Sequence, residues 1–315
     1  MTPMNFLISI VICTYNRKEL LLKTIDSVIN QALDSTKYEI VIVDNNSTDG
    51  TLEFIKERYK QHHNIRYLLE TNQGISFSRN CGWQNSSAKY IAYIDDDEIA
   101  DYFWLEELLK TIQQNDNNVG AVGGKVDPIW GSKPPEWLNE ELSIYFSFFN
   151  LSDNTIKITK NQGIGSGNAI YPKEVLEKIG GFDTELKSRV GKSLVSGEDT
   201  LLNKIIMLKG YEIYYEPGAV VKHLVHSDRL TKSWLMKRFF WAGYSHSYID
   251  QHILRDISGK SVFVHNTSQF FIKSYNIILN TVLALLSPMF KDKSTLLFIC
   301  RTLKNTGYIY KIINK

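Results

Sequence analysis

The chain has 315 residues, which is enough for one large α/β domain or for one domain with an appendage, and 43% of them are hydrophobic. Its 36 basic and 34 acidic side chains leave a formal net charge of +2, so no global field indicates a nucleic-acid partner. Three widely spaced cysteines, Cys13, Cys81 and Cys300, form no CxxC pair and predict neither a disulfide framework nor a zinc site. This usage fits the reducing cytoplasm best.

The first apolar run, residues 6–13, has no basic residue before it and no small-residue cleavage site after it. We therefore interpret the run as a buried strand and not as a signal peptide. Together with the cysteine usage, this predicts a protein that stays in the cytoplasm.

Strand-like apolar runs alternate with amphipathic segments along the first 126 residues. The pattern predicts strands over residues 6–13, 38–43, 65–69, 90–94 and 119–126. It predicts helices over residues 18–30, 52–59, 76–85 and 104–112. Alternation at this spacing predicts an α/β fold, in which a mostly parallel central sheet carries helices on both faces.

The second half of the chain is less regular. Three prolines between residues 127 and 137 indicate a crossing loop. Further on, the sequence predicts a strand and a helix opened by Pro172 (162–182), a helix that ends at Gly210 (193–210), and a strand or hairpin that ends at His223 (211–223). A further helix is expected from Thr231 to about residue 254.

Four consecutive acids, Asp95 to Glu98, follow directly after the predicted strand at 90–94. Like charges packed this closely cost free energy unless water solvates them or a cation gathers them. Hard divalent cations prefer carboxylate oxygen ligands, so one interpretation of the run is a metal site. The alternative is a solvated acidic turn that caps the next helix.

Polar clusters follow three of the predicted strands at the point where each strand ends, at residues 14–16, 44–47 and 95–97. In open α/β sheets, ligands bind beyond the carboxyl ends of the strands. We therefore expect these three clusters to meet at one rim of the sheet.

Six motifs in a fixed order carry a resemblance to a known family. They are ISIVICTYNR (8–17), EIVIVDNNSTDGT (39–51), NQGISFSRNCG (72–82), YIDDDE (93–98), GGFD (180–183) and GEDTLL (197–202). Over about residues 6 to 245 the sequence resembles the family 2 glycosyltransferases, which have the GT-A fold. The resemblance implies inverting transfer of a sugar from a nucleotide donor, usually a UDP-sugar, with Mn²⁺ or Mg²⁺. The chain lacks the QxxRW motif of processive members, which favours single addition.

The resemblance also implies a nucleotide site made from two strand ends and a later element. The residues implied are Thr14, Tyr15, Arg17, Asp44, Asn45, Gly74, Arg79, Asp95 and Asp96. A carboxylate after the second strand can accept from the uracil N–H. The glycine and arginine match the family's NxGxxxARN element, where the arginine reaches the base or a phosphate. An ordinary Asx-rich turn is the alternative for residues 44–51.

The same resemblance implies a metal site and a catalytic base. Asp97 would ligate the metal, and His223 would complete the site, with His226 as the weaker choice and a packed or surface histidine as the alternative. Asp199 of the ED pair would be the base, and Glu198 would orient the acceptor. The alternative is that Asp199 only caps its helix.

We expect a GT-A catalytic domain over residues 1–230, with its nucleotide-binding half at about 1–126 and its acceptor half at about 127–230. A C-terminal helical extension covers residues 231–315. Its apolar stretch at 270–290 is interrupted by Lys273 and other polar residues, so it is a poor spanning helix and a plausible interfacial one. Surrounding cations favour an anionic membrane surface at the inner face of the cell membrane. The alternative is a helical appendage packed on the protein or on a dimer partner.

The expected partners are a nucleotide-sugar donor and a saccharide or lipid-linked acceptor, and family habit suggests surface polysaccharide synthesis. Two further classes remain open. A sugar-phosphate nucleotidyltransferase would need a glycine-rich loop after the first strand, where CTYNRKE has no glycine. A catalytically inactive binding protein would not need Asp97, Glu198 and Asp199 together.

Two other segments leave alternatives open. GIGSGN (163–168) lacks the context of a dinucleotide fingerprint, and we interpret it as a flexible segment near the donor sugar. Six aromatic residues form either a sugar-stacking lid or part of the core. They are Trp130, Trp137, Tyr145, Phe146, Phe148 and Phe149.

Overall fold

A computed structural model describes residues 6–115, 118–160, 162–186, 194–257, 261–287 and 295–314. The described residues group by packing into two compact units that are interleaved in the sequence. The first unit lies within Met1–Ile129, Ser147–Thr184 and Glu198–Leu224. The second unit lies within Trp130–Phe146, Glu185–Gly197 and Val225–Lys315. The domain boundaries expected above stay predictions.

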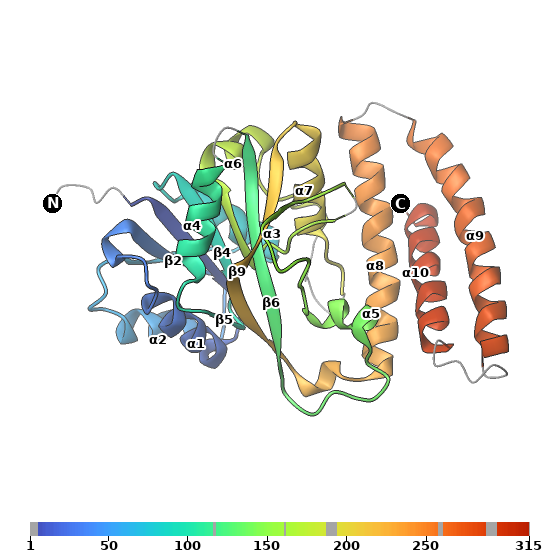
Figure 1. Cartoon of the computed structure of the whole chain (residues 1–315), viewed down its shortest axis with the longest axis horizontal. Helices are drawn as coiled ribbons and strands as arrows, with labels where there is room; N and C mark the ends of the chain where they lie inside the picture. The colour runs from blue at the N-terminus through green and yellow to red at the C-terminus, as the bar shows by residue number, and fades with distance from the viewer. Residues whose placement is uncertain are drawn as a thin grey trace. The chain divides into compact units, whose positions relative to one another are not determined.

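The first unit is built on a sheet that has nine strands in the described part of the chain (Figure 1). The strand order is β3-β2-β1-β4-β8-β6-β9-β5, and β7 pairs with β9. The strands are β1 (Ile8–Thr14), β2 (Tyr38–Asp44), β3 (Ile65–Leu69), β4 (Tyr90–Asp95), β5 (Glu98–Ala100), β6 (Val119–Trp130), β7 (Ile156–Lys157), β8 (Asn168–Pro172) and β9 (Glu212–Val225). The α/β class and the strands expected over the first 126 residues are confirmed.

Helices cover both faces of this sheet. They are α1 (Lys18–Ile29), α2 (Thr51–Arg58), α3 (Ile75–Gln84), α4 (Trp104–Gln114), α6 (Lys173–Ile179) and α7 (Glu198–Leu208). Pro172 is the N-cap residue of α6, and Gly180 follows the helix with a φ of 83°. The expected helix positions are therefore confirmed in the first unit.

The sheet is parallel on one side and antiparallel on the other. β3, β2, β1 and β4 run parallel, as the alternation of strands and helices predicts. β8 pairs antiparallel with both β4 and β6, and β9 pairs antiparallel with β5 and β7. A buried apolar strand carries no signal for its direction, so the mixed character of this half does not follow from the hydrophobic pattern.

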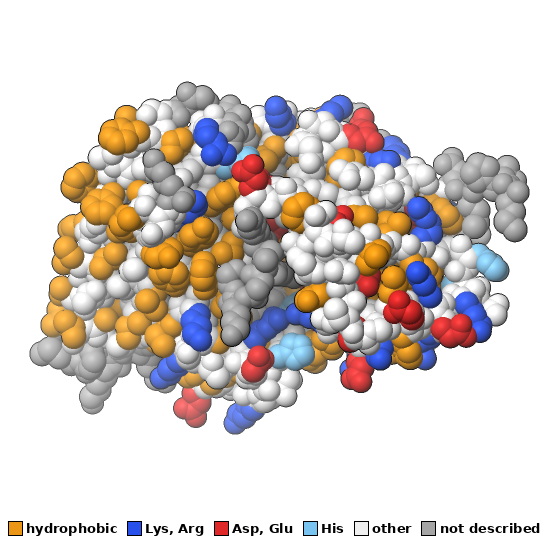
Figure 2. Space-filling view, turned by 180° about the vertical axis from the view of Figure 1, so that it is seen from behind, with side chains coloured by type: hydrophobic (Ala, Val, Ile, Leu, Met, Phe, Trp, Pro, Cys, Tyr) orange, Lys and Arg blue, Asp and Glu red, His pale blue; other side chains and the backbone are white. Residues whose placement is uncertain are grey.

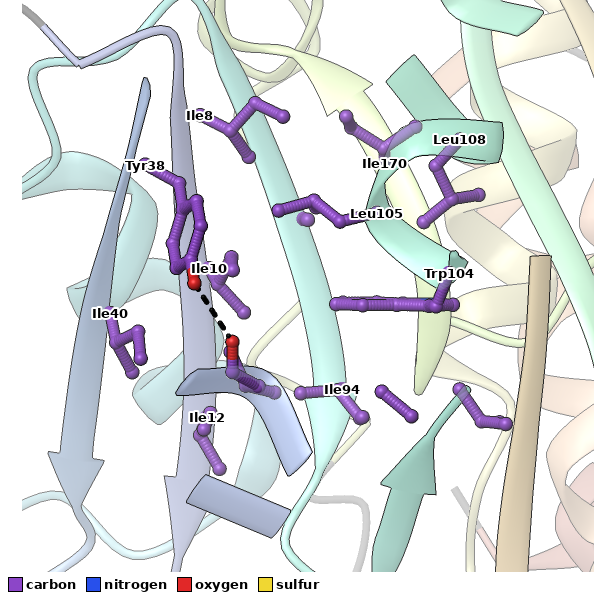
Figure 3. Packing of buried hydrophobic residues seen from close by; sticks show 14 of the residues in the cluster. Ile8, Ile10, Ile12, Tyr38, Ile40, Ile94, Trp104, Leu105, Leu108 and Ile170 are labelled. Carbon is purple, nitrogen blue, oxygen red and sulfur yellow. Dashed lines mark hydrogen bonds between the residues drawn. The ribbon is translucent and has the colours of Figure 1, made fainter. Parts of the chain in front are cut away.

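Two hydrophobic cores lie on the two faces of the sheet because successive strand residues point to opposite sides. In β1, Ile10 belongs to one core, while the next residue, Val11, belongs to the other. Figure 3 shows the first core, where Trp104 and Leu105 of α4 pack beside Ile94 of β4. Both faces are thus sealed by side chains, so the polar residues at the strand ends are left to form the site.

The strand register brings the predicted polar clusters to one edge. Thr14 at the end of β1 pairs with Asp44 at the end of β2. On the other side of β1, Cys13 pairs with Asp95 at the end of β4. The expectation of a common rim is therefore confirmed.

The second unit is mainly helical, with α5 (Glu140–Ser143), α8 (Lys232–His252), α9 (Val262–Leu286) and α10 (Thr295–Ile313). Its core contains Phe146 and residues of α8 and α10, with Trp130, Trp137 and Tyr145 packed against it. Phe149 packs against the cores of the first unit. The core interpretation is confirmed for Phe146, which is buried, while the other four are partly buried side chains that pack against a core.

α10 lies between α8 and α9, and α8 and α10 touch through glycines (Figure 1). A Cβ atom added at Gly243 of α8 would lie 1.7 Å from the carbonyl oxygen of Lys304. A Cβ atom added at Gly307 of α10 would lie 1.9 Å from the carbonyl oxygen of Phe240. The two backbones are therefore in direct contact. Tyr308 adds a polar link, because its hydroxyl donates to Asp250 at 2.9 Å and lies 3.2 Å from Nε2 of His265 in α9.

Candidate active site

The acid run after β4 is a tight turn that returns as β5. The fourth acid turns back, because the Glu98 carboxylate accepts a hydrogen bond of 3.0 Å from the backbone N–H of Asp95. β5 pairs antiparallel with β9, which places Glu98 opposite His223, and the N–H of Leu224 donates to the Asp97 carbonyl at 3.0 Å. This pairing brings the His223 Nε2 atom to 3.4 Å from Oδ1 of Asp97.

Arg17 lies over the acid run from the loop after β1. Its Nη1 atom is 3.0 Å from Oδ1 of Asp96 and 3.0 Å from Oδ2 of Asp97. Thr14 donates to the other Asp96 oxygen at 2.8 Å. Burial raises the pKa of Asp96 to about 6, and it outweighs the opposing effect of Arg17. The Asp96 and Asp97 carboxylates therefore stabilise a positive charge at the position of the Arg17 guanidinium.

Arg79 of α3 joins the acid run to the ED pair. Its guanidinium donates to Asp95 at 2.9 Å and to Glu198 at 3.0 Å, and it lies 5.3 Å from the centre of the Phe182 ring. Burial lowers the pKa of this guanidinium, but the facing carboxylates outweigh burial and raise the pKa above its usual value. Arg79 is therefore a fully charged, buried brace between two segments of the candidate site.

The second strand end is held by its own side chains. Asp44 accepts from the Ser47 N–H at 3.1 Å and from the Ser47 hydroxyl, which closes the turn after β2. The Asn45 amide donates to the carbonyls of Glu70 and Asn72, and its oxygen accepts from the Gly74 N–H at 2.9 Å. Asn45 thus fixes the loop that leads to α3 and leaves Gly74, with a φ of 138°, at the first turn of that helix.

The two acids of the ED pair have different surroundings. Glu198 is buried and is held by Arg79. Asp199 is half-buried, and its Oδ1 atom accepts from the backbone N–H of Thr200 at 2.6 Å. Consecutive helical residues point about 100° apart, so one acid faces the brace while the other points elsewhere.

The glycine-rich segment at 163–168 lies against the acid run. A Cβ atom at Gly167 would lie 2.9 Å from Cγ of Asp95, so only glycine fits there without displacing the carboxylate. Asn168 accepts from the Trp104 indole at 2.7 Å and donates to the carbonyls of Lys125 and Ala219. The segment was expected to be flexible, yet these bonds anchor its end. In the sequence, the signal for this anchor is an asparagine, Asn168, directly after the glycine-rich run.

The structure brings most of the predicted site residues together at this rim. Thr14, Arg17, Asp96, Asp97 and His223 form one connected group. A second group, Asp95, Arg79 and Glu198, adjoins it through the acid run. Asp44, Asn45 and Gly74 line the neighbouring strand end, and Tyr15, which follows Thr14 in the chain, is 47% exposed. The individual roles assigned to these residues stay predictions.

The donor set can be compared with what a divalent cation needs. In the described part of the chain, no group of three or more His, Cys, Asp or Glu side chains is arranged to hold a metal ion. Asp97 and His223 do face each other, however, and they offer one carboxylate oxygen and one imidazole nitrogen. Mg²⁺ usually takes one or two protein ligands and completes its shell with water and phosphate oxygens, so the pair fits such an ion.

Comparison with known proteins decides the family. The model of the family described as "Glycosyl transferase family 2" matches residues 9–180, which is more than half of the chain. The chain belongs to glycosyl transferase family 2. It is therefore a glycosyltransferase, and the resemblance drawn from the six motifs is confirmed.

Two curated relatives of this glycosyltransferase extend beyond the matched region. A glucosyl-dolichyl phosphate glucuronosyltransferase of Haloferax volcanii is 25% identical over 313 residues, which cover 97% of this chain and 96% of the relative. The succinoglycan biosynthesis protein ExoM of Rhizobium meliloti is 28% identical over 244 residues, which cover 76% of this chain and 74% of the relative.

Solved structures confirm the GT-A fold. Staphylococcus aureus TarS 1–349 in complex with UDP has a TM-score of 0.55 and 16% identity, and the match covers 98% of this glycosyltransferase and 90% of TarS. GalNAc-T7 with UDP, GalNAc and Mn²⁺ has a TM-score of 0.58 and 16% identity, with 78% and 51% of the two chains covered. At this identity the likeness shows the fold alone.

The brace predicts a large stability effect. Arg79→Ala should lower the free energy of unfolding by about 3–5 kcal/mol, because it leaves the buried Glu198 and the partly buried Asp95 without their cation. Urea unfolding measures this change. The control is Arg58→Ala, which should cost no more than about 1 kcal/mol, because the Arg58 side chain is 49% exposed and its Nη2 atom lies 3.9 Å from Asp26. Equal losses in the two variants would contradict the brace.

Proposed function

We propose that this glycosyltransferase moves a sugar, with inversion, from a UDP-sugar to a lipid-linked saccharide. The observation that carries the proposal is the unequal pair at the start of α7. Arg79 holds Glu198 in the protein, while the adjacent Asp199 is half-buried. A single displacement needs one carboxylate that can reach an acceptor hydroxyl, and the half-buried position of Asp199 supports it in that role.

Asp199 takes the proton of the acceptor hydroxyl as the hydroxyl oxygen attacks the anomeric carbon. The new glycosidic bond forms on one face of the sugar while the bond to the diphosphate breaks on the other. The bonding electrons leave with the diphosphate, so the configuration inverts. Glu198 supports this step indirectly, since its ion pair with Arg79 fixes the first turn of α7.

The donor would lie across the carboxyl ends of β1, β2 and β4. Asp44 and the loop shaped by Asn45 would contact the nucleoside, and Arg17 would pair with diphosphate oxygens as a bidentate cation. UDP appears in the names of the TarS and GalNAc-T7 structures, which supports this donor class.

A divalent cation would be held by Asp97 and His223. Bound there, Mn²⁺ or Mg²⁺ would neutralise charge that develops on the departing diphosphate. The GalNAc-T7 structure with Mn²⁺ supports the assignment. Arg17 would then leave the Asp97 carboxylate and pair with the donor diphosphate, because the metal ion and the guanidinium would compete for that carboxylate.

The acceptor side is supported by relatives and by composition. Relatives from Haloferax volcanii and Methanococcus voltae are named for dolichyl-linked substrates. Helices α9 and α10 carry Lys273, Arg301, Lys304 and Lys311 and no acidic residue. α9 is also long and apolar enough to cross a membrane by length and composition, and none of its residues is buried.

An interfacial position of α9 fits these features better than a spanning one. Lys273 and several asparagines interrupt the apolar stretch, and the helix packs along α10 on one side. Figure 2 shows hydrophobic side chains spread over the left part of that view, with Lys and Arg side chains among them. The anionic inner leaflet is the occupant that matches an apolar face with only positive charges.

The base is tested by Asp199→Asn. Asparagine caps a helix about as well as aspartate but does not accept a proton, so transfer should fall at least about a hundredfold while folding and UDP binding are retained. Sugar transfer is measured with a radiolabelled UDP-sugar panel. Asp34→Asn is the matched control, because Asp34 also accepts from a backbone N–H, that of Thr36 at 2.9 Å. Near wild-type transfer by Asp199→Asn would move the base elsewhere, with Glu198 next.

The metal is tested by chelation and by Asp97→Ala. Excess EDTA should silence the wild type, and added Mn²⁺ or Mg²⁺ should restore it. Asp97→Ala should lose both turnover and Mn²⁺ binding in the presence of UDP, as measured by calorimetry. Asp101→Ala should keep both, because Asp101 is a nearby acid whose carboxylate accepts from the Phe103 N–H at 3.3 Å. Undiminished turnover in excess EDTA removes the metal from this proposal.

The membrane surface is tested by flotation with liposomes. The wild type should float with anionic liposomes, and the double variant Phe271→Glu with Ile278→Glu should not, because both side chains are more than 60% exposed on α9. Phe54→Glu, on α2 of the first unit, should float like the wild type. If all three proteins float equally, α9 does not bind the membrane.

A further inference from the structure

A pocket of about 710 Å³ lies in the second unit between α8, α9 and α10. Gln251 of α8, Arg255 of the π-helical turn η4 (Ile253–Ile257) and Lys311 of α10 line one part of it. Side chains between Val262 and Phe271, at the start of α9, line most of the rest. Its volume lies within the range of pockets that bind small molecules, about 300–1,000 Å³.

The wall contributed by α9 is aromatic and apolar. Phe263, Phe270 and Phe271 line the pocket, and Ile312 of α10 adds to the same wall. Phe263 and Phe271 are also 79% and 68% exposed, so the pocket is continuous with the exposed apolar side of α9. A hydrocarbon chain could therefore extend from the pocket onto the exposed phenylalanines of α9.

The polar part of the pocket is positively charged. Among the described residues that line it, Arg255 and Lys311 are cationic and none is acidic. The Lys311 ammonium lies 5.6 and 5.8 Å from the ring centres of Tyr244 and Tyr248, which hold the cation at the wall. Lys311 has no acidic partner within the ranges that the structure describes.

One buried polar atom also points to a ligand. Oδ1 of Asn266, on the lining face of α9, is buried and makes no hydrogen bond. Leaving a buried amide oxygen unsatisfied costs about 1–3 kcal/mol, and such groups normally find a partner. A hydroxyl or a water carried by a bound headgroup would satisfy it.

We propose that this pocket binds a lipid phosphate, a phosphate group joined to a long hydrocarbon chain. The two cations would hold the phosphate, and the phenylalanines would hold the first part of the chain. A free anion would leave the aromatic wall without a partner, and a neutral hydrocarbon would leave the Lys311 ammonium without an anion. The pocket contains both features, so it fits an anionic amphiphile.

The inference rests on the proposed function, since a lipid-linked acceptor carries such a phosphate. Bulk anionic phospholipid has the same chemistry and is the other source. In either case the pocket would fix where α9 sits at the membrane. An acceptor lipid would in addition be selected by the shape of its single isoprenoid chain.

The test is binding of soluble lipid phosphates to the full chain. Farnesyl phosphate, farnesol and dioctanoyl phosphatidylglycerol are titrated by calorimetry into the wild type, Lys311→Gln and Lys273→Gln. Lys273 is the matched control, because its ammonium lies over the Tyr308 ring at 4.9 Å and does not line the pocket. We expect the wild type to bind farnesyl phosphate, Lys311→Gln to weaken binding about tenfold, and Lys273→Gln to leave it unchanged.

The lipid arms identify the source. Preference for farnesyl phosphate over the phosphatidylglycerol supports an acceptor-lipid site, while equal or opposite preference with the same Lys311 effect supports a phospholipid site. Equal weakening by both lysine variants, or farnesol binding as tightly as its phosphate, overturns the proposal that this pocket binds a lipid phosphate. UDP-sugar turnover is measured on the same preparations. Turnover without lipid binding sinks this inference alone, and absent turnover in the wild type sinks the proposed function.

Discussion

The buried Arg79 guanidinium connects two carboxylates that lie far apart in the sequence, Asp95 at the end of β4 and Glu198 at the start of α7. A buried carboxylate destabilises the fold unless it is paired. The ion pairs of Arg79 therefore stabilise the conformation of the rim in which both carboxylates face its guanidinium. Through Asp95 it anchors the start of the acid turn, and through Glu198 it orients the first turn of α7. The acid turn and the start of α7 therefore share one structural element.

The fold of the first 126 residues could be predicted because its strands and helices differ in hydrophobic period. The common rim was also predictable, since the polar clusters follow parallel strands. The antiparallel half could not be predicted in the same way. β8 and β9 are apolar strands whose direction depends on partners far away in the chain. β5 has only three residues and follows the acid run, so the pattern around it indicates a turn.

The site could be predicted as a set of residues, but less well as a set of contacts. The motifs identified Arg79 as a nucleotide contact, whereas the structure shows its guanidinium between two protein carboxylates. Glu98 was counted with the acids, although it caps the turn that presents them. Such contacts depend on β5 pairing with β9 and on Gly167 approaching Asp95, and neither is visible in local sequence.

Backbone contact makes α8 and α10 a matched pair of helices. Two helices that meet through side chains can each change partner, because many combinations of apolar side chains fill the same space. At Gly243 and Gly307 only a hydrogen atom fits between the two helix backbones. A chimera that joins this α8 to the last helix of another protein would need a glycine at the facing position. In recombination or design, α8 and α10 should therefore be transferred together.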